Sequence, residues 1–321
     1  MDPTNYIKRL NKEQREAYDK VFGPIIVMAP AGTGKTDVIA LRAYNAYKSG
    51  VKPESMLLLT FTNRAAKSMK NRLEAVLGDI SQNIKISTFH GLCGYILRQE
   101  AVNLHLSHEF IVIDDDDSRS IIKDIIVGKG FKSHLYYKEE QLFVDFIRLS
   151  REYPFVNDKR LDAKVFFEGL LDERNLNSSL LSLSDVALEI LNLYKSKLRD
   201  FNLMDFTSLV VGVLNAFQQD SIKERWEKCY EWIELDEVQD TNIIEYKIIK
   251  TLYEKHSNIA LFGDIHQTIY EWRGSQPNEI LRDFKINNPG YKQIRFEENY
   301  RSTKLILRAA ESFLGNTHPD T

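Results

Sequence analysis

The sequence predicts an α/β fold in which a helical subdomain is inserted into a parallel sheet. Three observations lead to this prediction. Short apolar runs alternate with helical patterns, polar residues directly follow several of those runs, and one long internal stretch is almost entirely helical in its spacing. The chain has 321 residues, 43% of them hydrophobic and 28% charged, which is ordinary for a globular protein of about two domains.

Five apolar runs are the expected strands of the sheet. They comprise residues 25–28, 56–59, 84–87, 232–235 and 259–262. Each has the length of a buried strand, and residues 63–77 carry a helical pattern between two of them. Strands that alternate with helices form parallel sheets through right-handed crossovers, and such sheets bind ligands at the carboxyl ends of their strands. The polar residues that follow these runs therefore predict a ligand site at that edge.

Residues 110–205 predict a helical insertion, because leucine, isoleucine, phenylalanine and charged residues recur there at helical spacing. One amphipathic face consists of Leu183, Val186, Ile190, Leu193, Tyr194 and Leu198. The acidic run at residues 114–117 suggests either a metal site or a helix start. Four consecutive carboxylates point in different directions, and acidic side chains favour the first turn of a helix, so we expect a solvated helix start.

Charge and cysteine content narrow the function classes. The net charge is −3, but residues 1–100 carry +6 and the remainder carries −9. A basic patch of this kind can hold a phosphate backbone, although scatter among solvated faces explains the imbalance equally well. Cys93 and Cys229 are the only cysteines, so we expect neither a disulfide framework nor a zinc site. No apolar run is long enough to span a bilayer, and residues 1–10 lack the apolar core of a secretory signal, so we expect a cytoplasmic protein without membrane contact.

The strongest chemical signal is a phosphate-loop pattern directly after the first expected strand. It runs Ala29-Pro30-Ala31-Gly32-Thr33-Gly34-Lys35-Thr36, with Ala29 in place of the first glycine. Small residues let backbone N–H groups curl around phosphates, and the helix that follows adds its positive N-terminus. We therefore predict an ATP site in which Lys35 contacts the β- and γ-phosphates and the Thr36 hydroxyl binds Mg²⁺.

A carboxylate pair ends the fourth apolar run. We expect Asp236 to hold Mg²⁺, directly or through water, and Glu237 to orient and deprotonate the attacking water. The pair is weak evidence alone but strong evidence downstream of a phosphate loop. Glu234 interrupts the apolar run, so we expect one side of this strand to be less buried than usual.

Together these motifs resemble those of the superfamily 1A DNA helicases of the UvrD/Rep/PcrA type. The segment Asp236-Glu237-Val238-Gln239-Asp240-Thr241-Asn242 resembles motif II of that family. The other matching segments follow in the family's order: the Q motif at 10–17, motif Ia at 60–66, a strand end at 87–91, a segment at 202–206, motif III at 263–274 and motif IV at 298–303. The resemblance covers essentially the whole chain and implies a RecA-like P-loop NTPase sheet.

The resemblance also implies roles for individual residues. Gln14 would read the adenine edge, Tyr300 would stack on the adenine, Gln267 would sense the γ-phosphate, and Arg301 would bring positive charge to it. A channel for single-stranded DNA would be lined by Phe61, Asn63, His90, Tyr270, Trp272 and Arg273. Aromatic side chains in such a channel stack on bases without sequence preference.

The sequence departs from the family pattern at three positions. Asp37 stands where a basic residue often follows motif I, and Ile265 and His266 stand where the family usually has acids. The sequence given stops shortly after motif IV, so the later motifs and their second catalytic arginine are absent from it, and we expect these residues alone to be poorly active.

The expected domain organisation follows from the resemblance. Residues 1–109 and 206–290 would form motor domain 1A, residues 110–205 the helical domain 1B, and residues 291–321 the start of motor domain 2A.

The implied function is an ATP-dependent DNA helicase or translocase that moves 3′ to 5′ on single-stranded DNA or acts at single-/double-strand junctions. The main alternative is a DNA-stimulated ATPase subunit of a repair or phage-defence complex, with protein partners and no unwinding activity of its own. A non-catalytic nucleic-acid scaffold is disfavoured by the intact Lys35, Thr36, Asp236 and Glu237. A small-molecule kinase is disfavoured by motif II and by Trp272-Arg273-Gly274.

Overall fold

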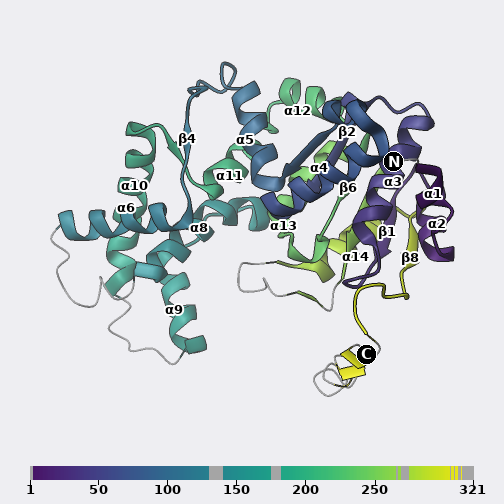
Figure 1. The fold of residues 1–321 in the computed structure, drawn as a ribbon. Coiled ribbons are helices and arrows are strands. Elements are labelled where there is room, and N and C mark those ends of the chain that lie inside the picture. The colour runs from purple at the N-terminus through teal and green to yellow at the C-terminus, as the bar shows by residue number, and fades with distance from the viewer. Residues whose placement is uncertain are drawn as a thin grey trace. The chain divides into compact units, whose positions relative to one another are not determined.

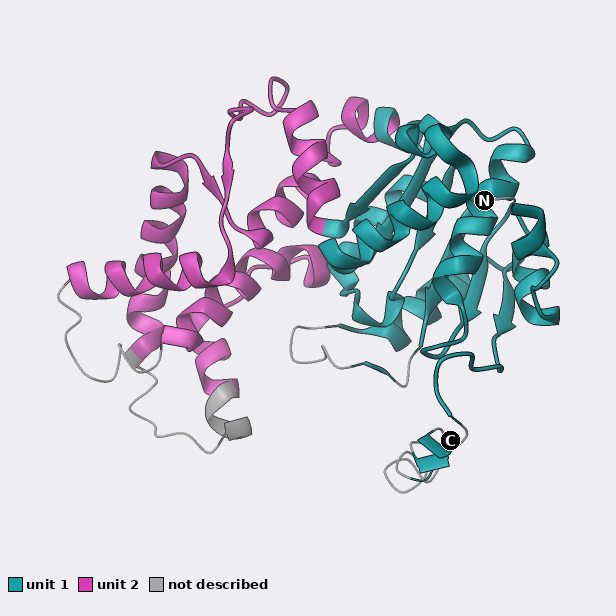
Figure 2. Cartoon of the chain, in the orientation of Figure 1, with its two compact units in different colours: residues 1–89, 225–321 teal, residues 90–224 magenta. Residues whose placement is uncertain are grey.

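The computed structural model describes residues 3–129, 140–174, 182–264, 267–268 and 275–303, and a few single positions after 303. The chain divides into two compact units (Figure 1, Figure 2). Unit 1 comprises residues 1–89 and 225–321, and unit 2 comprises residues 90–224. The division into four segments that the sequence suggests stays a prediction.

A six-stranded sheet forms the centre of unit 1, and its strand order is β3-β2-β6-β7-β1-β8. Its strands are β1 (Ile25–Met28), β2 (Met56–Thr60), β3 (Lys85–Thr88), β6 (Trp232–Leu235), β7 (Ile259–Gly263) and β8 (Lys292–Arg295). Every pairing in it is parallel. The predicted α/β fold is confirmed, and the five apolar runs correspond to five of the strands with bounds that differ by at most one residue.

Strand β8 is absent from the sequence prediction. It lies at the sheet edge beside β1, and of its four residues only Ile294 is buried. Its Lys-Gln-Ile-Arg sequence lacks an apolar run because an edge strand needs to cover the core with few side chains.

The helices of unit 1 lie between and around these strands. They are α1 (Pro3–Ile7), α2 (Lys12–Asp19), α3 (Lys35–Lys48), α4 (Asn63–Leu77), α13 (Ile243–Tyr253) and α14 (Pro277–Asn287), with short 3₁₀ turns at Pro53–Ser55, Gly78–Asn83 and Val238–Asp240. α12 (Asp220–Glu227) crosses from unit 2 into unit 1. Helix α4 has the predicted bounds.

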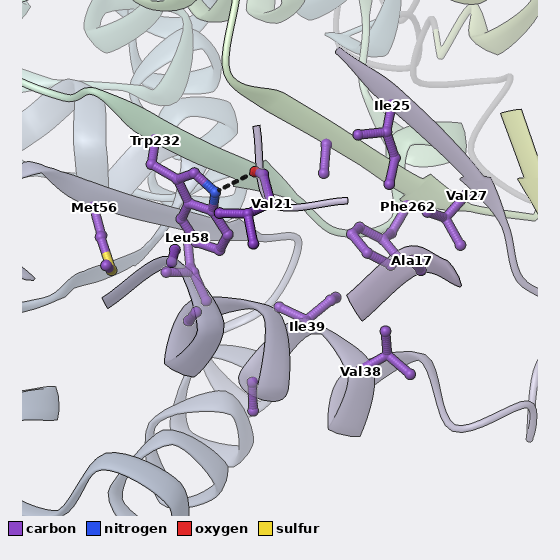
Figure 3. Close-up of a cluster of buried hydrophobic side chains, with 14 of the residues drawn as sticks. Ala17, Val21, Ile25, Val27, Val38, Ile39, Met56, Leu58, Trp232 and Phe262 are labelled. Atoms are coloured by element: carbon purple, nitrogen blue, oxygen red, sulfur yellow. Dashed lines mark hydrogen bonds between the residues drawn. The ribbon is translucent and has the colours of Figure 1, made fainter. Parts of the chain in front are cut away.

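The main core of unit 1 joins one face of the sheet to α2, α3 and α4 (Figure 3). Apolar side chains of β1 and β2, such as Val27 and Leu58, meet Val38 and Ile39 of α3 there. The indole Nε1 of Trp232 donates a hydrogen bond of 3.0 Å to the carbonyl oxygen of Val21. The core therefore fixes the strand that precedes the carboxylate pair against the helix that follows the phosphate loop.

The expectation that one side of β6 is less buried is wrong. The side chain of Glu234 is only 1% exposed, and its Oε1 lies 2.6 Å from Nε of Arg42, which is equally buried. Arg42 also donates to the carbonyl oxygens of Ala17 and Lys20 at the end of α2. Arg42 of α3 offsets part of the free-energy cost of burying Glu234, although it lies 192 residues away in sequence.

The described part of unit 2 is mostly helical, and it includes the described residues of the 110–205 stretch for which the sequence predicts helices. Its helices are α5 (Phe89–Gln99), α6 (Asp115–Gly128), α8 (Glu140–Asn157), α9 (Ala163–Arg174), α10 (Ser182–Asp200) and α11 (Phe206–Ala216). Two short strands, β4 (Ile111–Val112) and β5 (Leu203–Met204), pair in parallel. The core contains the predicted face of α10, with Ile190, Tyr194 and Leu198 buried and Val186 and Leu193 packed against them.

The acidic run at residues 114–117 starts a helix, as expected. The Asp114 side chain accepts hydrogen bonds from the backbone N–H groups of Asp116 and Asp117, and α6 begins at Asp115. Over the described residues, no group of three or more histidine, cysteine or acidic side chains is arranged to hold a metal ion. None of the helices in the described part of the chain has the length and apolar content of a membrane span.

Candidate nucleotide site

The loop between β1 and α3 adopts a conformation that only small residues allow. Gly32 and Gly34 have φ values of 82° and 78°, in the left-handed region that favours glycine. The Thr33 hydroxyl donates to the carbonyl oxygen of Pro30 at 2.7 Å, which tightens the loop. Helix α3 then begins at Lys35, so its unpaired N–H groups open at the end of the loop, as in an anion site.

Gln14 supports this loop from α2. Its Nε2 donates to the carbonyl oxygen of Thr33 at 2.9 Å, and its Oε1 accepts from the backbone N–H of Asn11 at 3.1 Å. A Cβ at Gly34 would lie 2.9 Å from the same Nε2, which is a second reason for glycine there. Gln14 of α2 therefore fixes the position of the loop at Thr33. Its contact with adenine stays a prediction.

Lys35 joins the phosphate loop to the carboxylate pair. Its Nζ lies 3.1 Å from Oδ1 of Asp236 and 2.5 Å from Oε2 of Glu237. Asp236 follows β6 directly, and its Oδ1 also accepts from the backbone N–H of Glu237 at 3.0 Å. Three of the predicted site residues are thus gathered at the carboxyl end of β6, where a parallel sheet binds its ligand.

Glu237 has an unusual backbone conformation, with φ 56° and ψ 48°. A non-glycine residue in the left-handed region costs free energy and persists where the surroundings impose it, often at functional sites. The conformation turns the chain from β6 into the 3₁₀ turn Val238–Asp240 and leaves the Glu237 side chain about one third exposed.

Burial and neighbouring charges shift the pKa values in this cluster. Burial raises the pKa of Asp236, with Lys35 opposing the shift and Glu237 adding to it. Burial alone would lower the pKa of Lys35, but Asp236 and Glu237 outweigh it, so its pKa is raised and the ammonium stays charged. Burial and the nearby Glu237 raise the pKa of Asp240 to about 6.

The residues around Lys35 fit a Mg²⁺ ion of the kind that accompanies nucleotide phosphates. Such an ion takes oxygen ligands, usually from one or two protein groups together with phosphates and water. Thr36 in the first turn of α3 and Asp236 supply a hydroxyl and a carboxylate. Oδ1 of Asp240 is buried and has no hydrogen-bond partner among the described residues, so a further carboxylate oxygen is available.

The end of β7 forms the opposite side of the cluster. Gln267 Nε2 donates to Oδ2 of Asp264 at 2.6 Å. The backbone N–H of Asp264 donates to Oε1 of Gln239 at 3.0 Å, and Gln239 Nε2 donates to Oε2 of Glu237 at 2.7 Å. The predicted sensor Gln267 is therefore connected to Glu237 through Asp264 and Gln239. Gln239 belongs to the motif II segment, in which it has no predicted role.

The motif IV segment crosses the phosphate loop. The backbone N–H of Tyr300 donates to the carbonyl oxygen of Gly32 at 2.8 Å, and Asn299 Nδ2 donates to that of Ala31 at 2.6 Å. The Tyr300 hydroxyl accepts from Asn11 Nδ2 at 3.0 Å. Tyr300 thus lies near the α2 end of the site.

Arg301 also lies beside the phosphate loop. A Cβ at Gly32 would be 2.8 Å from the Cβ of Arg301, whose side chain is exposed. The catalytic role of Arg301 and the base-stacking role of Tyr300 stay predictions.

The predicted DNA-contacting residues are only partly described. Phe61 is half-buried just beyond β2, and Asn63 is exposed at the start of α4. His90 belongs to unit 2, where its ring lies 4.7 Å from that of Phe206. Tyr270, Trp272 and Arg273 lie outside the described residues, as do Ile265 and His266.

The amino-acid sequence is similar to a known protein family and to proteins that are named helicases. The chain matches the family described as UvrD/REP helicase N-terminal domain over residues 10–286. A Staphylococcus epidermidis protein named ATP-dependent DNA helicase PcrA is 35% identical over 311 residues, which cover 96% of this chain and 40% of that protein. The Staphylococcus aureus protein of the same name is 33% identical over 313 residues, covering 97% and 40% respectively. The chain spans about two fifths of the length of these relatives. By its sequence match, and with a phosphate loop and carboxylate pair gathered at one edge of a parallel sheet, the chain belongs to the UvrD/REP helicase N-terminal domain family.

Proposed function

We propose that this chain is the nucleotide-hydrolysing part of an ATP-dependent DNA helicase or translocase that moves 3′ to 5′ on single-stranded DNA in the cytoplasm. The observation that carries the proposal is the contact of Lys35 with both Asp236 and Glu237 beside the phosphate loop. The relatives that cover nearly the whole chain are named ATP-dependent DNA helicases, which supports the same conclusion.

The proposed chemistry is hydrolysis of the bond between the β- and γ-phosphates. The Lys35 ammonium neutralises phosphate charge, and the loop N–H groups orient the nucleotide. Glu237 takes a proton from a water molecule whose oxygen attacks the γ-phosphorus while the bridging P–O bond breaks, which yields ADP and phosphate. Thr36 and Asp236 would hold Mg²⁺, which supplies charge stabilisation at the phosphates when bound.

Unit 1 also carries candidates for the DNA contact. Phe61 and Asn63 lie at the carboxyl end of β2, at the same edge of the sheet as Asp236. Parallel pairing of β2 and β6 brings these strand ends together, which supports coupling between DNA contact and the nucleotide site.

The test is ATPase and strand-displacement activity of the complete protein. Glu237→Gln should retain ATP and DNA binding while turnover falls roughly 10²- to 10⁴-fold, as expected for loss of a positioned base. Lys35→Ala should weaken ATP binding and abolish hydrolysis. Matched controls are Glu254→Gln and Lys48→Ala, which change exposed side chains of unit 1 and should leave turnover unchanged.

Two results would contradict the proposal in different ways. Wild-type turnover in Lys35→Ala would remove the nucleotide site from this cluster. DNA-stimulated hydrolysis without strand displacement would instead favour an ATPase motor subunit of a larger repair or defence complex.

A further inference from the structure

The side chain of Gln239 is buried, and it bonds both to the residue pair that follows β6 and to the residue that follows β7. It is 4% exposed and lies in the turn that follows Glu237. Both of its ends are engaged, since Nε2 donates to Oε2 of Glu237 at 2.7 Å and Oε1 accepts from the backbone N–H of Asp264 at 3.0 Å. A side chain with this pair of contacts joins the ends of β6 and β7 by two hydrogen bonds.

The side chains of Gln239 and Val238 leave no room for a Cβ at Gly263, the last residue of β7. A Cβ at Gly263 would lie 2.4 Å from Oε1 of Gln239 and 2.8 Å from Cγ1 of Val238. The backbone of Gly263 has no left-handed φ, so the glycine is needed for close approach and not for its conformation. Any larger residue at Gly263 would push Gln239 away from its partners.

The two contacts of the Glu237 carboxylate fall on the same oxygen. Lys35 Nζ and Gln239 Nε2 both bind Oε2, at 2.5 and 2.7 Å. The Glu237 side chain is also about one third exposed, so water can reach it. The carboxylate is thus oriented through Oε2, which favours Oε1 as the proton acceptor.

We propose that Gln239 is a positioning residue that selects Oε1 of Glu237 as the proton acceptor and links Glu237 to the segment carrying Gln267. The second half of the link is the 2.6 Å hydrogen bond from Gln267 Nε2 to Oδ2 of Asp264, the residue whose N–H binds Gln239. A change at Gln267 on phosphate loss would be transmitted to Glu237 through three hydrogen bonds, by way of Asp264 and Gln239. This inference rests on the proposed ATPase function for its kinetic consequences, but the link itself can be measured without activity.

Three variants of the complete protein test the inference. Gln239→Leu has a similar size but makes neither hydrogen bond, so kcat should fall roughly 10- to 100-fold, part of the range for a mispositioned base, while affinity for a fluorescent ATP analogue stays within about twofold. Gly263→Ala should give the same phenotype by displacing Gln239. The double variant should be no slower than the worse single variant, because both changes remove one interaction. Gln218→Leu, at an exposed position, is the matched control.

Gln239→Glu gives a readout that a merely structural residue would not produce. It keeps an acceptor for the Asp264 N–H but places a second carboxylate against Oε2 of Glu237. The two carboxylates repel each other, so Glu237 leaves the position that Gln239 gives it, and kcat should fall at least as far as in Gln239→Leu while affinity for the ATP analogue stays within about twofold. A wild-type kcat in Gln239→Glu, or additive losses in the Gln239→Leu/Gly263→Ala double variant, would overturn the inference.

Hydrogen exchange separates this inference from the proposed function. In Gln239→Leu the Asp264 amide loses its acceptor, so a peptide covering residues 259–268 should exchange at least about tenfold faster at one amide, with circular dichroism unchanged. If the wild-type protein hydrolyses no ATP, the proposed function fails while the exchange experiment still decides whether the link exists. Unchanged exchange would reject the link even in an active ATPase.

Discussion

Each compact unit buries an arginine–carboxylate pair, and the two pairs shift the carboxyl pKa in opposite directions. In unit 1, Nε of Arg42 lies 2.6 Å from Oε1 of Glu234, yet burial outweighs Arg42 and raises the pKa of Glu234 to about 7. In unit 2, burial acts on Asp205 in the same sense, but Arg151 and further donors outweigh it, and the pKa of Asp205 is lowered to about 2.

The difference lies in the number of donors that each carboxylate receives. Arg151 binds both oxygens of Asp205, at 3.0 and 2.6 Å, and the backbone N–H of Ser208 and the Tyr194 hydroxyl add bonds of 2.7 and 2.8 Å. Among the residues that the structure describes, Glu234 receives only the Arg42 contact, and its Oε2 is buried without a hydrogen-bond partner. The comparison teaches that an arginine nearby does not by itself keep a buried carboxylate ionised; enough donors do.

The largest expected effect is at Arg42, because its removal isolates a buried acid. Arg42→Met should lower the free energy of unfolding of unit 1 by about 3–5 kcal/mol, the range for breaking a buried pair. Adding Glu234→Leu should restore at least half of that loss, since no uncompensated carboxyl remains. The measurement is urea denaturation followed by hydrogen exchange of a peptide covering β6.

Arg15→Met, on the exposed side of α2, is the control for Arg42→Met and should change stability by less than about 0.5 kcal/mol. A double variant as unstable as Arg42→Met alone would show that the arginine stabilises mainly through the carbonyl oxygens of Ala17 and Lys20.

Opposite pKa shifts predict opposite pH dependence in the two units. The pKa of Glu234 is raised from 4.5, so its contribution is complete below about pH 4.5 and is lost as the pH rises through about 7, a change of roughly 3 kcal/mol. The pKa of Asp205 is lowered from 3.8, so its contribution is complete above about pH 4 and is lost as the pH falls through about 2, a change of roughly 2 kcal/mol.

Hydrogen exchange at pH 5 and pH 8, corrected for intrinsic rates, checks this prediction. Peptides over β6 should lose protection between these values, whereas peptides over α11, which Asp205 caps, should not. Asp236 contributes to the slope at β6 with the same sign, because its pKa is also raised. Glu234→Gln isolates the Glu234 share, and an unchanged slope in that variant would assign the whole effect to the nucleotide cluster.

The same contrast explains what could be predicted from the sequence. Apolar runs identify β1, β2, β6 and β7 because these strands are buried along most of their length, and the run at 84–87 identifies β3 although its residues are only half-buried. The burial of Glu234 is not predictable from its own strand, since the compensating Arg42 lies on another element. Strand β8 has one buried side chain and no periodic signal, and β4 and β5 contribute two residues each.

The candidate site also has features that the sequence predicts and features that it does not. Lys35, Asp236 and Glu237 can be predicted to meet because each follows a strand of one parallel sheet. The hydrogen bonds of Gln239 depend on how closely the ends of β6 and β7 approach, which no residue spacing encodes. The roles of Gln267, Tyr300 and Arg301 come from the family resemblance and stay predictions.

A smaller effect is expected at Arg151, because Asp205 keeps other donors. Arg151→Met should lower the free energy of unfolding of unit 2 by about 2 kcal/mol, within the range for hydrogen bonds to charged groups. The remaining bonds from Ser208 N–H and Tyr194 still stabilise the ionised carboxylate, so the pKa of Asp205 should rise but the acid should stay ionised at pH 7. Thermal and urea unfolding, read from exchange of peptides over α11, measures the loss. A loss as large as that of Arg42→Met would remove the distinction between the pairs.

The smallest effect is expected at Tyr194, which supplies one of several donors to Asp205. Tyr194→Phe keeps the ring in the core of unit 2 and removes only the hydroxyl that donates to Oδ2 at 2.8 Å. The same oxygen still accepts from Nη2 of Arg151 at 2.6 Å, so no buried acceptor is left bare. We expect a loss of about 1 kcal/mol, the net value of one hydrogen bond, and a modest rise in the pKa of Asp205. Urea denaturation measured at pH 3 and pH 7, with Tyr153→Phe on α8 as the control, should show a larger part of the loss at pH 7, where Asp205 is fully ionised. If Tyr194→Phe instead costs as much as Arg42→Met, the donors of Asp205 act as one unit and cannot substitute for each other, and donor number would no longer explain why the two pairs differ.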